Sequence, residues 1–270
     1  MLMMGIEWAG SRIGRLALLA FLMALGLFGC LSPHDSTWER VQETGVLRVG
    51  MDASFPPFES IAADGSLVGF DVDLAREVSQ RLGVEPHFVA NLPYDGLYDA
   101  LTASRVDVVI SALAVNPART ADFAYSSPYF DAGYILVVRQ RGKAIRSIGD
   151  LSNRSLAVIL GTPGDREARE RARRSSDFVV VQYRAPMRAL DAVRTGETDA
   201  ALVDRVSALN AIGAGRPVTI VGEPVVSVPY AVALRDDSQR LLRAINSALT
   251  AMEEDGTLDR LVTEWLRDER

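Results

Sequence analysis

The hydrophobic pattern of this chain alternates between short apolar runs rich in β-branched residues and longer stretches with helical spacing. The runs predict strands at 46–50, 85–90, 106–110, 133–138, 156–160, 178–181 and 225–234. Apolar residues three or four positions apart predict helices at 38–44, 71–81, 94–101, 187–194, 241–252 and 258–265, with Gly256 between the last two, and a charged helix is predicted at 165–174. Strands that alternate with helices indicate an α/β protein with mainly parallel sheets.

The region after the first strand is expected to hold a loop, a hairpin and a helix start. Two prolines at 56 and 57 exclude ladder pairing over 51–58. The dipeptide Asp64-Gly65 predicts a hairpin turn. We expect the carboxylate of Asp71 to cap the following helix. Because Asp71 and Asp73 lack the further ligands and the glycine of a calcium loop, capping and solvation explain them better than a metal.

The segment 105–130 organises the rest of the chain. Its run 106–110 is interrupted only by Asp107, as in a parallel strand buried on both faces. In open α/β sheets, ligands bind beyond the carboxyl ends of the strands. Small residues follow the strand there and leave the backbone open to close approach, namely Ser111, Ala112 and Ala114.

A short helix is predicted directly after those small residues. Asn116 is a good N-cap and Pro117 suits the first helical position. Arg119 then lies in the first turn, where its guanidinium and unpaired backbone N–H groups suit a carboxylate.

The second half of the chain repeats this plan. Residues 192–202 match 100–110 as helix, turn, aspartate and strand. Asp204 then occupies the strand end that corresponds to Ala112, so we expect an acid to face Arg119 across a cleft. The turn Gly161-Thr162 between strand and helix adds backbone N–H groups that suit an anion.

The first 29 residues have the pattern of an export signal. Arg12 and Arg15 precede an uncharged run at 16–28, which is too short to span a bilayer. Cys30, the only cysteine, closes this run and resembles the lipidated cysteine of a bacterial lipoprotein, so no internal disulfide is expected.

Charge and composition exclude several classes of function. Without residues 1–29 the chain has 27 basic and 34 acidic residues and no basic stripe, which argues against nucleic-acid binding. With two histidines, His34 and His87, and one lysine, Lys143, most parts of a nucleophilic triad or a histidine metal centre are missing. We therefore expect no metal, no cofactor and no enzyme, unless carboxylates alone carry the chemistry.

Taken together, these segments resemble the extracellular solute-binding proteins, family 3, of the polar-amino-acid type. The matching segments are 47–58, 69–75, 105–130, 161–162, 199–204 and 230–265. The resemblance implies the fold of a type II periplasmic binding protein, with two α/β lobes joined by a two-strand hinge and a ligand cleft between them. It also implies capture of a small solute, most simply an amino acid, for the permease of an ABC importer.

The resemblance also implies roles for particular residues. Arg119 would bind the α-carboxylate, helped by N–H groups near Ala114 and Thr162. Asp204 would bind the α-ammonium, with the carbonyl of Ala112 assisting. Opposite charges presented from facing strand ends match a zwitterion independently of the family.

The ligand's side chain would lie in a separate pocket. Phe55 and Tyr94 would sandwich it, and Asp52 and Ser111 would line the pocket. The chain departs from the family pattern at Ala114, where a hydroxyl residue is common, and at Pro163-Gly164, where proline removes a donor. The carboxylate would therefore be held by fewer groups, or the ligand is not a plain α-amino acid.

The expected organisation is a signal peptide at 1–29, a lipidated tether at 30–43, lobe 1 at 44–131 with 230–270, and lobe 2 at 132–229. This places a monomer in the periplasm or at the cell surface, anchored through Cys30. Two alternatives stay open on the same fold. One is a periplasmic dehydratase of the cyclohexadienyl type, with Asp165 or Glu167 as an acid of raised pKa. The other is a binding protein that senses its ligand.

Overall fold

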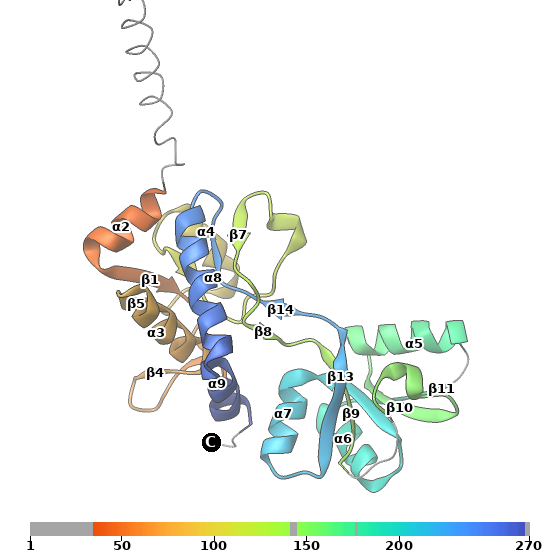
Figure 1. Ribbon diagram of the computed structural model, residues 1–270. Coiled ribbons are helices and arrows are strands. Elements are labelled where there is room, and N and C mark those ends of the chain that lie inside the picture. The colour runs from red at the N-terminus through yellow and green to blue at the C-terminus, as the bar shows by residue number, and fades with distance from the viewer. Residues whose placement is uncertain (1–34, 141–144, 176–177, 268–270) are drawn as a thin grey trace, which may run out of the picture. The chain divides into compact units, whose positions relative to one another are not determined.

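The computed structural model describes residues 35–140, 145–175 and 178–267, and the chain divides into two units, Met1–Asp35 and Ser36–Arg270. The description below concerns the second unit (Figure 1). The predicted signal peptide and Cys30 lie outside the described residues. Within those ranges no helix combines the length and the apolar character needed to cross a membrane.

The first sheet has five strands in the order β5-β1-β6-β15-β7. β1 pairs in parallel with β5 and β6, while β15 pairs antiparallel with β6 and β7. The strands are β1 (Val46–Gly50), β5 (Glu85–Val89), β6 (Val108–Val109), β7 (Phe123–Tyr125) and β15 (Ala233–Arg235). Five helices accompany this sheet: α2 (Ser36–Thr44), α3 (Phe70–Leu82), α4 (Leu97–Thr102), α8 (Gln239–Glu254) and α9 (Thr257–Leu266).

Both faces of the first sheet are covered by apolar side chains. Val108 belongs to a core that includes Leu74 of α3 and Leu241 of α8, whereas its neighbour Val109 packs with Leu97 of α4. Alternate residues of one strand therefore serve two cores, as expected for a strand buried on both faces.

The second sheet also has five strands, in the order β11-β10-β12-β9-β13. β10 pairs in parallel with β11 and β12, and β9 pairs antiparallel with β12 and β13. The strands are β9 (Tyr134–Arg139), β10 (Arg154–Ile159), β11 (Phe178–Tyr183), β12 (Ala200–Asp204) and β13 (Val218–Val226). Its helices are α5 (Pro163–Ser175), α6 (Pro186–Thr195) and α7 (Arg205–Gly213).

Short elements complete the described part. β2 (Ser54–Phe55), β3 (Glu59–Ile61) and β4 (Leu67–Val68) form a small antiparallel sheet. The chain leaves the first sheet after β7, passes through β8 (Phe130–Asp131) to the second sheet, and returns through β14 (Pro229–Tyr230) to β15. β8 and β14 pair antiparallel as a separate two-stranded sheet (Figure 1). Single 3-10 turns are η1 (Tyr94–Gly96), η2 (Pro117–Arg119) and η3 (Ile148–Asp150).

The internal repeat of the sequence corresponds to one structural device used in both sheets. Asp107 precedes β6 and accepts a hydrogen bond from the backbone N–H of Arg48 on β1, at 2.7 Å. Asp199 precedes β12 and accepts one from the N–H of Ser155 on β10, at 2.8 Å. Each aspartate thus binds a backbone N–H of the neighbouring parallel strand.

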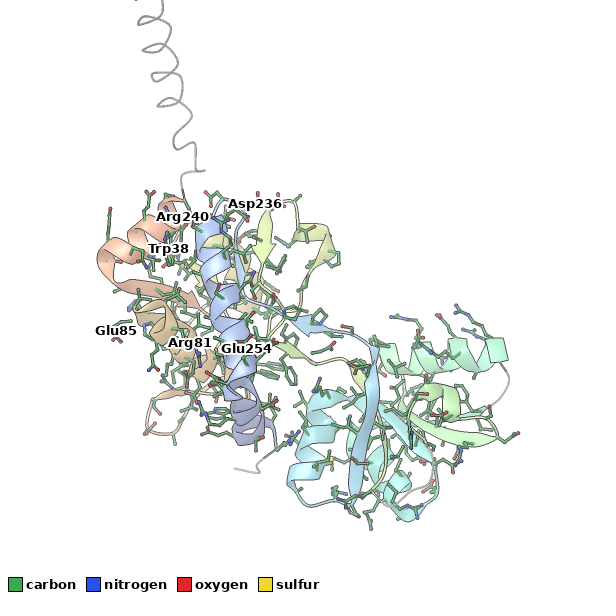
Figure 2. The ribbon with its side chains drawn as sticks, viewed as in Figure 1. Trp38, Arg81, Glu85, Asp236, Arg240 and Glu254 are labelled. Atoms are coloured by element: carbon green, nitrogen blue, oxygen red, sulfur yellow. The ribbon has the colours of Figure 1, made fainter. Side chains whose placement is uncertain are left out.

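The C-terminal helices are tied to the first sheet by charged side chains as well as by their apolar faces. Arg81, at the end of α3 and labelled in Figure 2, donates to the carboxylate of Asp255, the residue that follows α8, at 2.7 Å. At the other end of α8, Arg240 lies 3.8 Å from Glu39 of α2. The last helices are therefore held against α2 and α3, which flank β1 in the sequence.

Two local features after β1 differ from the structure expected from the sequence. Residues 54–55 form β2 and pair with β3, because the prolines follow the paired residues instead of lying among them. The helix α3 begins at Phe70 after Gly69, and Asp71 is not its cap but a fully buried side chain. Local sequence favoured capping, whereas a tertiary contact takes the carboxylate.

Two further elements differ from the expectation. The run 225–234 is divided among the end of β13, β14 and β15, which belong to three different sheets. The helix α7 was not predicted, because its apolar residues are distributed around the whole helix and form no apolar stripe. They are the alanines, Val206, Leu209 and Ile212.

Candidate functional site

A pocket of about 290 Å³ lies where the chain leaves β1 and β6, the position expected for a ligand in an α/β sheet. It also receives residues from the small antiparallel sheet and from β14. Its lining residues are Asp52, Ser54, Phe55, Glu59, Tyr94, Ser111, Ala112 and Tyr230.

Two aromatic side chains at the pocket are half exposed. Phe55 and Tyr94 each keep 50% of their surface accessible, which is unusual for large apolar groups. The ring of Phe55 stacks on Phe58 with centroids 5.7 Å apart and an angle of 7° between planes. Phe58 in turn packs edge-on against Tyr230, with centroids 5.4 Å apart. The pocket wall is thus a firm aromatic surface with free faces.

A chain of hydrogen bonds runs along the polar side of the pocket. The N–H of Tyr94 donates to Asp52 Oδ2 at 3.1 Å, and Ser54 Oγ donates to Asp52 Oδ1 at 2.7 Å. The N–H of Asp52 donates to Ser111 Oγ at 3.0 Å. Ser111 Oγ then donates to Glu59 Oε1 at 2.7 Å. These bonds fix the orientation of both pocket acids.

Behind the pocket, Glu59 is joined by a second buried acid, Asp71. Asp71 Oδ2 accepts hydrogen bonds from the N–H of Ala112 and from Tyr129 Oη. Ala112 has a φ of 42°, a left-handed conformation that is uncommon for alanine. The bond from Asp71 holds this strained backbone at the pocket wall. Burial raises the pKa of Glu59, and the charge of Asp71 raises it further.

Arg119 lies on η2, whose N-cap is formed as predicted. Asn116 Oδ1 accepts from the N–H of Ala118 at 3.0 Å. The guanidinium carbon of Arg119 lies 4.4 Å from the centre of the Tyr98 ring. Tyr98 Oη in turn hydrogen-bonds Tyr125 Oη at 2.8 Å. Within the described residues Arg119 has no ion-pair partner, so its hydrogen-bond donors are free for an anion.

Three further predicted residues do not line the pocket, and their contacts differ. Ala114 bridges to Tyr230, and its N–H has no acceptor within the described ranges. The N–H of Thr162 already donates to the carbonyl of Ile159 at 3.2 Å. Asp204 caps α7, since its Oδ1 accepts from the N–H of Ser207 at 2.8 Å. Asp204 also contributes to the raised pKa of Tyr230, which burial dominates.

Sequence reasoning missed three pocket residues, Ser54, Glu59 and Tyr230, and the Tyr98 ring beneath Arg119. Glu59 had one signal, an acid directly after the apolar Phe58 at the start of a short strand. Tyr230 follows Pro229, which interrupts the predicted strand, and this interruption was the one signal that marked its position. Nothing local marked Tyr98, because its partner is far along the chain.

The described part of the chain contains no group of side chains suited to binding a metal ion. No cluster of three or more histidine, cysteine, aspartate or glutamate side chains there is placed to hold an ion.

Two α/β sheets, each with helices, and a small pocket with polar and aromatic walls define a binding protein for a small molecule. The chain belongs to the bacterial extracellular solute-binding proteins, family 3, whose model matches residues 47–268. The family and the α/β fold expected from the sequence are confirmed.

Named relatives of this family are similar to most of the chain. The L-cystine-binding protein TcyJ of Escherichia coli K12 is 31% identical, over 94% of this chain and 96% of its own length. The lysine/arginine/ornithine-binding periplasmic protein of the same organism is 30% identical, over 90% of this chain and 95% of its own length. Both are named as binding proteins, in agreement with the expectation that this chain is not an enzyme.

Among solved structures, the unliganded open L-cystine solute receptor of Neisseria gonorrhoeae matches with a TM-score of 0.75 and 26% identity, covering 86% of this chain and 97% of that one. An ancestral cyclohexadienyl dehydratase matches with a TM-score of 0.73 and 27% identity, covering 85% and 95%. The fold is therefore common to binding proteins and to an enzyme, so the function of a chain with this fold has to be argued from the residues of its site.

Proposed function

We propose that this chain binds an amino acid outside the cytoplasmic membrane and delivers it to the permease of an ABC importer. The observation that carries the proposal is the unpaired guanidinium of Arg119 on Tyr98, near a pocket with exposed aromatic faces. Tyr94 of the pocket contributes to the raised pKa of Tyr98, which indicates that the two tyrosines are neighbours. An anion site beside an aromatic pocket suits a carboxylate joined to a side chain.

The roles of the residues follow from their free groups. Arg119 binds the α-carboxylate, and the free N–H of Ala114 is available to assist. Asp204 keeps Oδ2 free of donors in the described part of the chain and binds the α-ammonium, with the carbonyl of Ala112. Thr162 contributes only if the ligand displaces its bond to Ile159.

The side chain of the ligand lies between Phe55 and Tyr94, with Asp52 and Ser111 at the edge. Because named relatives bind cystine or basic amino acids, the first candidates are L-cystine, L-arginine, L-lysine and L-ornithine. Two acids at the pocket, Asp52 and Glu59, favour a ligand with a cationic or hydrogen-bonding side chain over an acidic one.

The proposal includes two lobes, 44–131 with 230–270 and 132–229, that close by a hinge at the paired strands β8 and β14. Asp131 supports this hinge, because its carboxylate accepts from the N–H groups of Gly133 at 2.7 Å and Val228 at 2.9 Å. It also includes cleavage before Cys30 and a lipid anchor there, which holds the protein in the periplasm or at the cell surface.

The test is a thermal-shift and calorimetric screen of the purified protein against the standard amino acids and cystine. A ligand at one hundred times its Kd adds about 2.7 kcal/mol to the free energy of unfolding. A shift with one group of amino acids supports the proposal and identifies the ligand class. No shift and no heat with any of them would contradict it.

The dehydratase alternative needs an acid of raised pKa, and its two expected acids are Asp165 and Glu167. Although burial alone would raise it, the pKa of Asp165 is lowered by hydrogen bonds from Gly161 and Gln182 and by the charge of Arg169. Glu167 is ion-paired with Arg171 at 2.6 Å. Asp165 therefore does not suit a general acid at neutral pH, and the carboxylate of Glu167 is already held by Arg171. Formation of an aromatic product from the cyclic precursor, followed by ultraviolet absorbance, would restore this alternative.

A further inference from the structure

Glu59 and Asp71 form a pair of buried carboxyl groups whose hydrogen bonds are incomplete. Glu59 is 1% exposed and Asp71 is fully buried. One oxygen of each has partners: Oε1 of Glu59 accepts from Ser111, and Oδ2 of Asp71 accepts from Ala112 and Tyr129. The other two oxygens, Oε2 of Glu59 and Oδ1 of Asp71, are buried and have no donor among the described residues.

The two carboxyl groups are neighbours in the fold. The N–H of Asp71 donates to the carbonyl of Phe58, the residue before Glu59, at 2.8 Å, and the consecutive residues Ser111 and Ala112 each donate to one of the two acids. The charge of Asp71 also opposes the ionisation of Glu59. An ionised carboxylate only accepts hydrogen bonds, so two of them cannot form one. A single proton between the unpartnered oxygens supplies the missing donor for both.

We propose that Glu59 and Asp71 share one proton at neutral pH, and that a cationic ligand side chain in the adjoining pocket displaces this proton. The pair then contributes to ligand specificity, because the pocket becomes more negative when a cationic side chain binds. The first half concerns the free protein alone, and the second half rests on the proposed binding of amino acids.

The surroundings of the pair supply no other neutralising charge. Asp52 faces Glu59 from the pocket and makes its ionisation less favourable. Tyr94, Tyr129 and Tyr230 face the pair, and its negative charge raises the pKa of each, after the larger effect of burial. In the described part of the chain neither Glu59 nor Asp71 has an ion pair with arginine or lysine.

The position of Glu59 and Asp71 lets a ligand in the pocket interact with the charge of the pair. Glu59 lines the pocket, whereas Asp71 lies behind it and holds the backbone of Ala112. With the proton the pair carries one negative charge, and without it two. A cation in the pocket interacts more favourably with the doubly ionised pair, while a neutral side chain leaves the proton in place.

The free protein provides the first test, through the pH dependence of chemical unfolding. In the unfolded chain both carboxyl groups ionise at their ordinary pKa, while burial raises the pKa of both in the folded state. The folded state therefore holds one more proton, and its stability is full at low pH and falls as the pH rises. This difference of one bound proton between the folded and unfolded states increases the unfolding equilibrium constant tenfold per pH unit, until the pair is fully ionised in the folded state.

The variant Glu59→Gln keeps a donor toward Asp71 but removes the titration. We expect its stability to exceed the wild type increasingly at higher pH, and Ser111→Ala, which keeps both carboxyls, to retain the wild-type slope. If Glu59→Gln does not fold, the double variant Glu59→Gln/Asp71→Asn serves the same purpose, because it removes both titrating groups. Infrared spectra at neutral pH provide a direct measurement, since the carbonyl band of a protonated acid should vanish in either variant. Parallel pH profiles for wild type and variant, with no such band in the wild type, would overturn the shared proton.

The second test uses calorimetry with L-arginine and L-glutamine in phosphate and in Tris, buffers with different heats of ionisation. The heat should depend on the buffer for arginine, with release of about one proton, and not for glutamine. In Glu59→Gln the dependence for arginine should disappear. Arginine binding without proton release would overturn the second half. Absence of any amino-acid binding would count against the proposed function and leave the first test intact.

Discussion

The guanidinium carbon of Arg119 lies 4.4 Å from the ring centre of Tyr98, 21 positions earlier in the chain. This contact orients the arginine without consuming any of its N–H donors. Tyr98 is fixed by Tyr125 through the bond between their hydroxyls. The arginine is thus held in place and still free to bind an anion.

Replacement of Arg119 by alanine should abolish most amino-acid binding. Loss of one partner of a desolvated charge pair costs about 2–5 kcal/mol, much of it from the ligand carboxylate left without a partner. Calorimetry with the ligand from the screen measures the effect. Arg105→Ala, an exposed arginine before β6, is the control and should bind normally. Equal affinity in both variants would remove Arg119 from the site.

Replacement of Tyr98 by leucine should weaken binding less than loss of Arg119. A cation–π contact at a partly exposed position contributes about 0.5–1 kcal/mol, so Kd should rise by roughly two- to fivefold. Tyr98→Phe keeps the ring and loses only the bond to Tyr125, so it should bind almost like the wild type. A larger loss in the phenylalanine variant would show that the hydroxyl, and not the ring face, positions Arg119.

Replacement of Phe55 by alanine should weaken ligand binding while it leaves the stability of the fold almost unchanged. The ring is half exposed, so its removal should change the free energy of unfolding by no more than about 0.5 kcal/mol. Loss of stacking with the ligand side chain should cost about 1 kcal/mol of binding. Ile61→Ala is a control in the same small sheet, since Ile61 is 55% exposed and does not line the pocket. Both quantities follow from denaturant titration and calorimetry.

Replacement of Asp107 by alanine should destabilise the fold without a direct effect on the pocket. This fully buried carboxylate accepts from the side chains of Arg40 and Arg48 as well as from the strand β1. Breaking such a pair should lower the free energy of unfolding by about 3 kcal/mol. Asp236→Ala, an exposed acid labelled in Figure 2, should leave it unchanged. Similar stabilities for the two variants would contradict this role.

Much of the fold could be predicted because its signals are local. The strand β1 has the predicted bounds, Val46–Gly50, and the glycines Gly83 and Gly196 follow their helices in left-handed conformations, as expected. The N-cap at Asn116 was also correct. Each of these features depends on residues only a few positions apart, where spacing and side-chain chemistry determine the backbone.

The site was less accessible to sequence reasoning. Asp52, Phe55, Tyr94, Ser111 and Ala112 all line one pocket, and their assignment to a ligand stays a prediction. For Asp71 the local pattern suggested a solvated cap, and burial contradicted it. A capping aspartate and a buried aspartate have the same sequence signal, because both can stand in the first turn of a helix.

The sequence by itself determined the alternation of strands and helices, the paired aspartates before β6 and β12, and the family. Only the tertiary structure decided that Glu59 meets Ser111 across 52 positions and that Asp71 meets Ala112 across 41. Backbone preferences are set by neighbours in the chain. Burial, and with it the protonation of a carboxyl group, is set by whichever segments the fold brings together.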